Sequence, residues 1–149
     1  MVGLTIMVMV ATLLIRIPLP AGGYLNFGDI VIVFTGLYAG SKAGLIAGGL
    51  GSALADLIGF PVYAPITLVV KGLEGLVCGF GYQKKGFLSF FAPLVGVLTM
   101  VTGYFVFEVF YPQTGVAGAI VNLPGNLIQA VSGYLGGRLL YQVFIKLEL

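Results

Sequence analysis

Long apolar stretches, separated by short breaks that contain glycine, proline or charged residues, follow one another along the whole chain. Most of them approach the roughly 20 residues that an α-helix needs to cross a bilayer core about 30 Å thick. The pattern therefore predicts an all-α integral membrane protein, a compact bundle of six transmembrane helices in which residues 1–149 form one domain. The expected helices cover residues 2–17, 29–38, 43–58, 64–80, 88–110 and 115–145, with a bend near Pro124 in the last.

Composition supports this class and argues against several others. The chain is 59% hydrophobic and 8% charged, with a mean hydropathy of +1.11, which lies outside the range of soluble domains. Histidine and tryptophan are absent and Cys78 is the single cysteine, so imidazole catalysis, zinc ligation and disulfide scaffolds lack their residues. We therefore expect no enzyme, and no metal or cofactor in this chain. The net charge of +2 is scattered, which argues against nucleic-acid binding.

The basic residues indicate an orientation, because cytoplasmic loops of membrane proteins are enriched in lysine and arginine. Arg16 lies near one side of the predicted bundle, whereas five other basic residues fall on or close to the opposite side. Both termini should therefore be cytoplasmic. The longest predicted loop, residues 18–28, and the turns at 59–61 and 111–113 then face outward together. The basic residues of the cytoplasmic side are Lys42, Lys84, Lys85, Arg138 and Lys146.

Five charged residues lie inside or at the ends of apolar stretches, where a charge costs at least ~3 kcal/mol and usually faces a cavity or a partner. Lys71 and Glu74 are three residues apart, so they share a helix face and can form an internal ion pair or orient a polar ligand. Asp56 can cap the following turn, pair with Lys71 or line a pocket. Asp29 is best explained as an N-terminal cap or dipole partner of the helix that begins there. Glu108 completes the set.

The last helix adds three amide side chains, Asn122, Asn126 and Gln129, whose spacings of four and three place them along one stripe. Such a stripe suits a neutral solute that forms hydrogen bonds, and it equally suits amide bonds between helices. Aromatic and polar side chains elsewhere can wall a pocket or anchor the protein at the membrane interface. The candidates for such walls are Tyr24, Asn26, Tyr63 and Tyr104.

Three segments with distinctive sequences occur in the first half of the chain: GGYLNFGD at residues 22–29, GGLGSALADL at 48–57 and KGLEG at 71–75. Together they resemble the substrate-binding S components of energy-coupling factor (ECF) vitamin transporters. The similarity extends from about Ile15 to Gly81, and more loosely through the last helix. Within this family the chain looks most like the branch associated with pyridoxine and hydroxymethylpyrimidine-type vitamins.

The resemblance implies a six-helix protein that captures a small water-soluble vitamin or precursor outside a prokaryotic cell, with the first loop as a lid. It also implies a transmembrane coupling subunit and two cytoplasmic ATPases as partners, and toppling of the S component to release its cargo inward. The chain lacks a GxxxxGK[ST] phosphate loop, so ATP and magnesium would bind the partner ATPases. S components typically dock through small residues spaced by four on the first helix, where this chain has Gly3, Met7 and Ala11.

The leading hypothesis is therefore the solute-binding subunit of an ATP-driven vitamin uptake transporter. The alternative is a standalone secondary transporter that uses Asp56 or Glu74 to carry protons. A third class is a scaffold whose charges only pair with one another. The expected ligand-binding residues are Tyr24, Asn26, Asp56, Lys71, Glu74, Asn122, Asn126 and Gln129.

Overall fold

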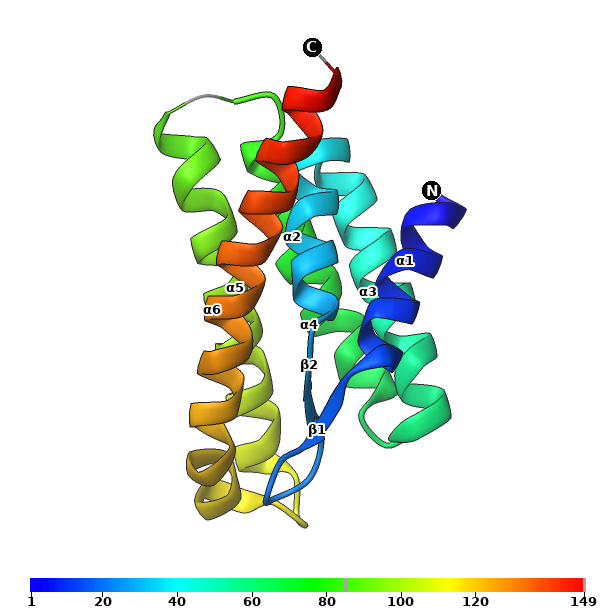
Figure 1. Cartoon of the computed structure of the whole chain (residues 1–149). Coiled ribbons are helices and arrows are strands. Elements are labelled where there is room, and N and C mark those ends of the chain that lie inside the picture. The colour runs from blue at the N-terminus through cyan, green and yellow to red at the C-terminus, as the bar shows by residue number, and fades with distance from the viewer. Residues whose placement is uncertain (85, 149) are drawn as a thin grey trace.

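The computed structural model describes residues 1–84 and 86–148 and contains, within these ranges, six α-helices and one two-stranded hairpin (Figure 1). The predicted bundle of six helices is thereby confirmed. The helices are α1 (Val2–Leu14), α2 (Gly28–Ala39), α3 (Ser41–Gly59), α4 (Ala64–Cys78), α5 (Phe87–Phe110) and α6 (Gly115–Glu148), and a 3-10 turn, η1 (Gly79–Gly81), extends α4. The strands of the hairpin are β1 (Arg16–Pro18) and β2 (Tyr24–Asn26).

The hairpin corrects the prediction of a first helix that reaches residue 17 and an irregular loop after it. Ile15 is extended, with φ −131° and ψ 112°, which ends α1 before it. β1 then pairs antiparallel with β2, with Ile17 opposite Leu25 at the centre. Gly22 and Gly23 make the connecting turn, because their φ values of 109° and 73° are rarely adopted by other residues. Strands this short leave no periodicity in the sequence that could be distinguished from a helix end.

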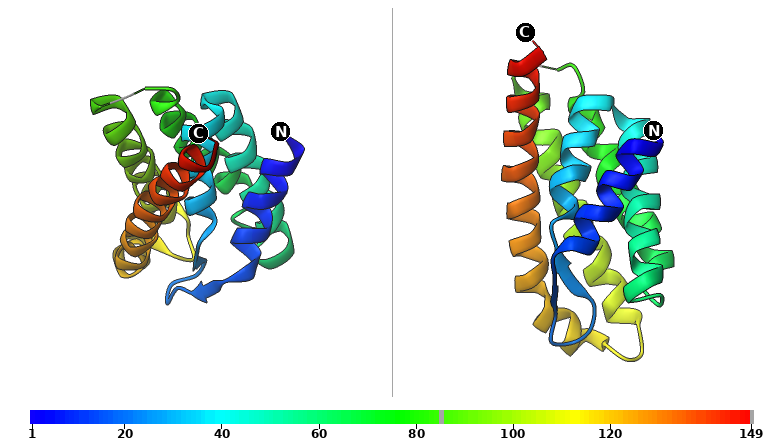
Figure 2. Two further views of the ribbon diagram at one scale, coloured as in Figure 1. Left: turned by 45° about the horizontal axis from the view of Figure 1, so that its top comes forward. Right: turned by 45° about the vertical axis from the view of Figure 1, so that its right-hand side comes forward.

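Helix α2 lies at the centre of the bundle and contacts all five other helices (Figures 1 and 2). Nine of its residues are buried, including Ile32 and Val33, so its neighbours shield a helix that is shorter than a lipid-facing span needs to be. Glycines allow the close approach of these neighbours. Gly137 of α6 packs on Val33, and Gly44 of α3 packs on the backbone of Gly75 in α4. The glycine spacing in the sequence thus corresponds to helix contacts. Helix α6 continues through Pro124 as one helix.

The polarity of the bundle is the reverse of that of a soluble protein. Large apolar side chains cover its outside, and Leu57 and Leu135 are 58% and 60% exposed. Lys71 and Glu74 are instead buried in the interior. Continuous apolar surface of this kind is stable in lipid rather than in water. The segment Ala64–Gly81 and helix α5 are each long and apolar enough to cross a membrane, whereas α1 and α2 are shorter apolar helices.

The two ends of the bundle carry different segments. The hairpin, the α3–α4 turn and the α5–α6 turn gather at one end, which is the lower end in Figure 1. Both termini and the α2–α3 turn lie toward the other end, as Figure 2 also shows. Lys42 at the start of α3 and Lys146 near the end of α6 belong to this second end. Lys85, which was assigned to the same side, lies outside the described residues.

Candidate functional site

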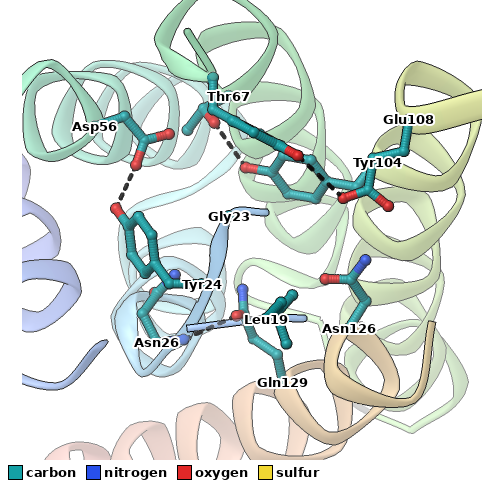
Figure 3. A pocket seen from close by; sticks show the side chains of 11 residues that line it. Leu19, Gly23, Tyr24, Asn26, Asp56, Thr67, Tyr104, Glu108, Asn126 and Gln129 are labelled. Atoms are coloured by element: carbon teal, nitrogen blue, oxygen red, sulfur yellow. Dashed lines mark hydrogen bonds between the residues drawn. The ribbon is translucent and has the colours of Figure 1, made fainter. Parts of the chain in front are cut away.

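A polar cavity lies between the hairpin and the adjoining parts of helices α3, α4, α5 and α6, at the lower end of the bundle in Figure 1. Segments far apart in the sequence therefore share one site (Figure 3). Its lining is rich in tyrosines, amides and carboxylates. The lining residues are Leu19, Gly23, Tyr24 and Asn26 of the hairpin, Asp56 of α3, Tyr63 and Thr67 at the start of α4, Tyr104 and Glu108 of α5, and Asn126 and Gln129 of α6.

The strand β2 closes the cavity through two hydrogen bonds to different helices. The hydroxyl of Tyr24 donates to a carboxylate oxygen of Asp56 on α3. The backbone N–H of Asn26 donates to Oε1 of Gln129 on α6, at 2.9 Å. The guanidinium of Arg16 lies 5.2 Å from the centroid of the Tyr24 ring and covers it. The hairpin is thus attached to both sides of the cavity that it covers.

Asn122 on α6 attaches the tip of the hairpin. Its Oδ1 accepts a hydrogen bond from the backbone N–H of Ala21 at 3.1 Å, and its Nδ2 donates to the backbone carbonyl of Gly22 at 3.0 Å. The same Nδ2 donates to Oε1 of Glu108 on α5, also at 3.0 Å. Asn122 is completely buried and does not line the cavity. It therefore holds the hairpin and Glu108 in a fixed relation.

Two hydrogen bonds connect the side chains of the cavity wall at the start of α4 with those on α5. Thr67 and Tyr104 share a hydrogen bond of 2.8 Å between their hydroxyl oxygens. The Tyr63 hydroxyl donates to Oε1 of Glu108 at 3.5 Å. Burial, together with the charge of Glu108, raises the pKa of Tyr63 to about 12, so this hydroxyl keeps its proton at neutral pH and acts as the donor. These contacts are drawn in Figure 3.

A cluster of charged side chains lies behind the cavity in the centre of the bundle. The ammonium group of Lys71 on α4 forms an ion pair and hydrogen bond with Asp29 on α2. Its Nζ also lies 3.4 Å from Oε2 of Glu74. Nε2 of Gln129 donates to Oδ2 of Asp29 at 2.8 Å, which links the cluster to Asn26 of the hairpin. Asp29 does lie in the first turn of α2, but its carboxylate binds Lys71 rather than acting as a local cap.

The structure places the eight expected ligand-binding residues in two groups. Five of them line the cavity: Tyr24, Asn26, Asp56, Asn126 and Gln129. The other three, Lys71, Glu74 and Asn122, are buried behind that lining and contact ion-pair or hairpin partners. Asp56 bonds to Tyr24, so the alternative in which it pairs with Lys71 is not the arrangement observed.

Tyr63 and Tyr104, which the sequence offers as candidates for pocket walls, both line the cavity, but the set of eight expected binding residues omits them. It also omits Leu19, Gly23, Thr67 and Glu108. Thr67 lies one helical turn before Lys71, and Tyr104 lies one turn before Glu108. Residues four apart share a helix face, so these spacings were a usable signal for the α4 and α5 walls. Leu19 had no such signal, because the position of the hairpin tip depends on tertiary contacts such as the packing of Leu19 on Gly125 of α6.

Only part of the expected docking stripe on α1 is exposed. Gly3 is exposed and has open space around it, and Met7 is 45% exposed. Ala11 is half-buried and packs against the cluster that contains Val8 and Ile32. The helix turns by about 100° per residue, so the face that Val8 directs into the bundle takes Ala11 with it. The outer stripe of α1 continues instead through Val10 and Leu14, which are 44% and 76% exposed.

The cavity is small. Its volume is about 30 Å³, which is room for one or two water molecules, whereas small-molecule sites span roughly 300–1,000 Å³. A ligand larger than a few water molecules could enter only if the lining separated. A few hydrogen bonds and the packing of its tip on α6 hold the hairpin over the cavity.

Comparison with known proteins agrees with this architecture. Residues 2–146 match the family described as ECF-type riboflavin transporter, S component. A protein of Pyrococcus woesei described as an uncharacterized protein in a gap 3' region is 45% identical over 140 residues, which are 90% of this chain and 92% of that protein. The thiamine precursor transporter HmpT of Lactococcus lactis subsp. cremoris (strain MG1363) is 32% identical over 125 residues, 83% of this chain and 71% of that protein. The chain therefore belongs to the S-component family of ECF-type transporters.

Proposed function

We propose that this protein captures a small water-soluble vitamin or vitamin precursor outside a prokaryotic cell and holds it in the cavity beneath the β1–β2 hairpin. The observation that carries the proposal is the polar cavity itself, which is built from five elements and covered by a segment held mainly by hydrogen bonds. Family membership supports a vitamin as the cargo. The thiamine precursor transporter among the relatives favours a heterocycle of the hydroxymethylpyrimidine type, with pyridoxine as the related candidate.

The hairpin serves as the lid in this proposal. Opening breaks the Tyr24–Asp56 bond and the Asn26–Gln129 bond, and it exposes groups that a ligand can then bind. Closing restores these bonds and excludes water from the ligand. Because hydrogen bonds are stronger in a dry site than in water, a closed lid raises affinity for a correctly shaped polar ligand.

Transport requires partners. The chain would associate with a transmembrane coupling subunit and two cytoplasmic ATPases, which bind ATP and magnesium and supply the energy. Residues 1–149 would act as one multi-pass membrane domain, with the hairpin end outside and both termini in the cytoplasm. The exposed stripe of α1, which includes Gly3 and Met7, is the proposed docking face for the coupling subunit.

Binding of purified protein to a panel of vitamins tests this function. Isothermal titration calorimetry in detergent, with hydroxymethylpyrimidine, thiamine, pyridoxine and riboflavin, should show one-to-one binding of at least one compound. Asn126→Ala should weaken that binding, because its amide lines the cavity, whereas Val106→Ala on the outer face of α5 should not. A panel without any binding would contradict the proposal.

A proton-coupled secondary transporter is the second candidate, and one observation favours it. Neither carboxylate oxygen of Glu74 accepts a hydrogen bond from the described residues, and the side chain is completely buried, so it could exchange a proton. In liposomes such a transporter would accumulate substrate under a pH gradient without ATP. Uptake that requires added coupling subunits and ATP would instead support the S-component role.

A further inference from the structure

We infer that the cavity selects a flat nitrogen heterocycle that bears an amino group or a positive charge, and that it discriminates against vitamins with a carboxylate or phosphate. The inference rests on the proposed function and concerns the same site. It begins with the carboxylates of Asp56 and Glu108, which lie on opposite sides of the cavity (Figure 3). None of the described lining residues is lysine or arginine.

Two cations, Lys71 and Arg16, lie near the cavity but do not line it. Lys71 lies behind the wall, with its Nζ 5.6 Å from the centroid of the Tyr104 ring, and it is shared by Asp29 and Glu74. That cluster therefore contains more carboxylates than ammonium groups. Arg16 covers the Tyr24 ring and is not part of the lining. An anionic ligand would thus meet carboxylates in a low-dielectric site, where repulsion between like charges is strong.

Glu108 supplies the specific acceptor. Its Oε1 already accepts from Asn122 at 3.0 Å and from Tyr63 at 3.5 Å. Its Oε2 is buried and receives no hydrogen bond from the described residues, and the side chain is 2% exposed. Oε1 is thus satisfied by two donors, whereas Oε2 is a buried acceptor that no described residue satisfies. A buried oxygen of this kind is costly to leave unpaired, and an amino or protonated ring N–H of a ligand would satisfy it.

Asn126 extends the recognition surface along α6. It lies one helical turn, about 6 Å of rise, after Asn122, which holds Glu108. No hydrogen bond of its side chain is formed within the described part of the chain, although it is 6% exposed and lines the cavity. An amide can donate and accept, so it complements a ring nitrogen next to an amino group. The tyrosine rings of the lining suit a flat aromatic partner.

Matched pairs of compounds test the inference. Pyridoxamine and pyridoxine differ by an amino group in place of a hydroxyl, and hydroxymethylpyrimidine can be compared with its analogue in which a hydroxyl replaces the ring amino group. We expect the amino member of a pair to bind wild-type protein at least about tenfold more tightly, as a charged hydrogen bond would provide. Pyridoxic acid and pyridoxamine phosphate should bind more weakly than either member of their pair.

The variant Glu108→Gln connects this preference to one residue. It should lower affinity for the amino compound by about tenfold or more, while affinity for the hydroxyl compound changes by less than about threefold. Val106→Ala, two residues away and on the outer face of α5, should change neither affinity, and the melting temperatures of both variants show whether they fold. If the Gln variant does not fold, the wild-type comparison is sufficient by itself.

Two results would overturn the inference in different ways. Tight binding of neutral or carboxylated compounds, with no preference for amino members or with a preference unchanged in Glu108→Gln, would reject the selectivity but keep the vitamin-binding function. Absence of binding by every compound of the matched pairs and the vitamin panel would reject the proposed function as well.

Discussion

Lys71 shows how this protein keeps a charge inside a lipid-facing bundle. Asp29 reaches its ammonium group from α2, and Glu74 approaches it from the next turn of α4. Burying an ion is expensive unless an opposite charge and hydrogen bonds compensate, and removing one partner leaves the other uncompensated. The cluster is also connected to the hairpin, because Gln129 bonds to both Asp29 and Asn26. Lys71 is therefore connected to the cavity lining through Asp29 and Gln129.

Lys71→Met should destabilise the fold. The substitution leaves Asp29 and Glu74 buried together without a cation, and we expect a loss of about 3–5 kcal/mol. Thermal unfolding of the detergent-solubilised protein measures the change. Lys42→Met is the matched control, because Lys42 is exposed and should alter the stability by less than ~0.5 kcal/mol. Equal melting temperatures of the two variants would show that the cluster does not stabilise the bundle.

At the scale of elements, the hairpin and the helices are held in different ways. The hairpin is attached by hydrogen bonds of Tyr24, Asn26 and the backbone at its tip, and these can break one at a time. Helices α3 and α4 are joined by backbone contact at Gly44 and Gly75, which leaves no room to slide. We therefore expect the hairpin to open while the α3–α4 pair moves as a unit.

Tyr24→Phe tests the lid. The variant keeps the ring under Arg16 but loses the hydroxyl that bonds to Asp56. The closed state should be weakened by about 1–2 kcal/mol, and bound vitamin should dissociate roughly tenfold faster in a stopped-flow competition experiment. Tyr141→Phe, on α6 and outside the cavity lining, is the control. An unchanged dissociation rate in Tyr24→Phe would mean that this bond does not keep the ligand in place.

Gly44→Ala tests the helix pair. A Cβ at this position would overlap the backbone carbonyl of Gly75, which cannot rotate away as a side chain could. We expect a destabilisation of about 1–3 kcal/mol from the forced separation of α3 and α4. Gly3→Ala introduces the same methyl group into α1, where nothing lies within 4 Å, and should leave the melting temperature unchanged or slightly raised. Similar melting temperatures would contradict the tight contact.

For the whole molecule, the two ends of the bundle define a direction. The cavity and hairpin occupy one end, and the termini lie toward the other. Lysines 42 and 146 belong to the terminal end, which the positive-inside rule assigns to the cytoplasm. In the proposed orientation the cavity end faces outward, where it would receive cargo for uptake.

Cysteine labelling in intact cells tests that orientation. In a Cys78→Ala background, Gln113→Cys in the α5–α6 turn should react with a membrane-impermeant maleimide from outside. Lys42→Cys should react only after the membrane is permeabilised. Both native side chains are exposed in the bundle, so reactivity reports the side of the membrane rather than burial. The reverse labelling pattern would invert the proposed topology.

The sequence by itself determined the helix count, the membrane class and the family, because these depend on local hydropathy and on short segments that are read along the chain. It also showed which residues share a face, such as Asn122, Asn126 and Gln129 on α6. Two members of that stripe, Asn126 and Gln129, line the cavity, and Asn122 is buried behind its lining.

Only the tertiary structure decided which faces meet. Asp29 binds Lys71, which is 42 residues away in the sequence, and Tyr24 bonds to Asp56, which is 32 residues away. No local pattern specifies these contacts. The hairpin was missed because its strands are too short to show a period and depend on α3 and α6 for support. Helix packing also determines that Asp56 and Glu108 line the cavity, whereas Asp29, Lys71 and Glu74 are buried behind the lining. The local sequence pattern thus determines which residues share a helix face, and helix packing determines which other residues that face contacts.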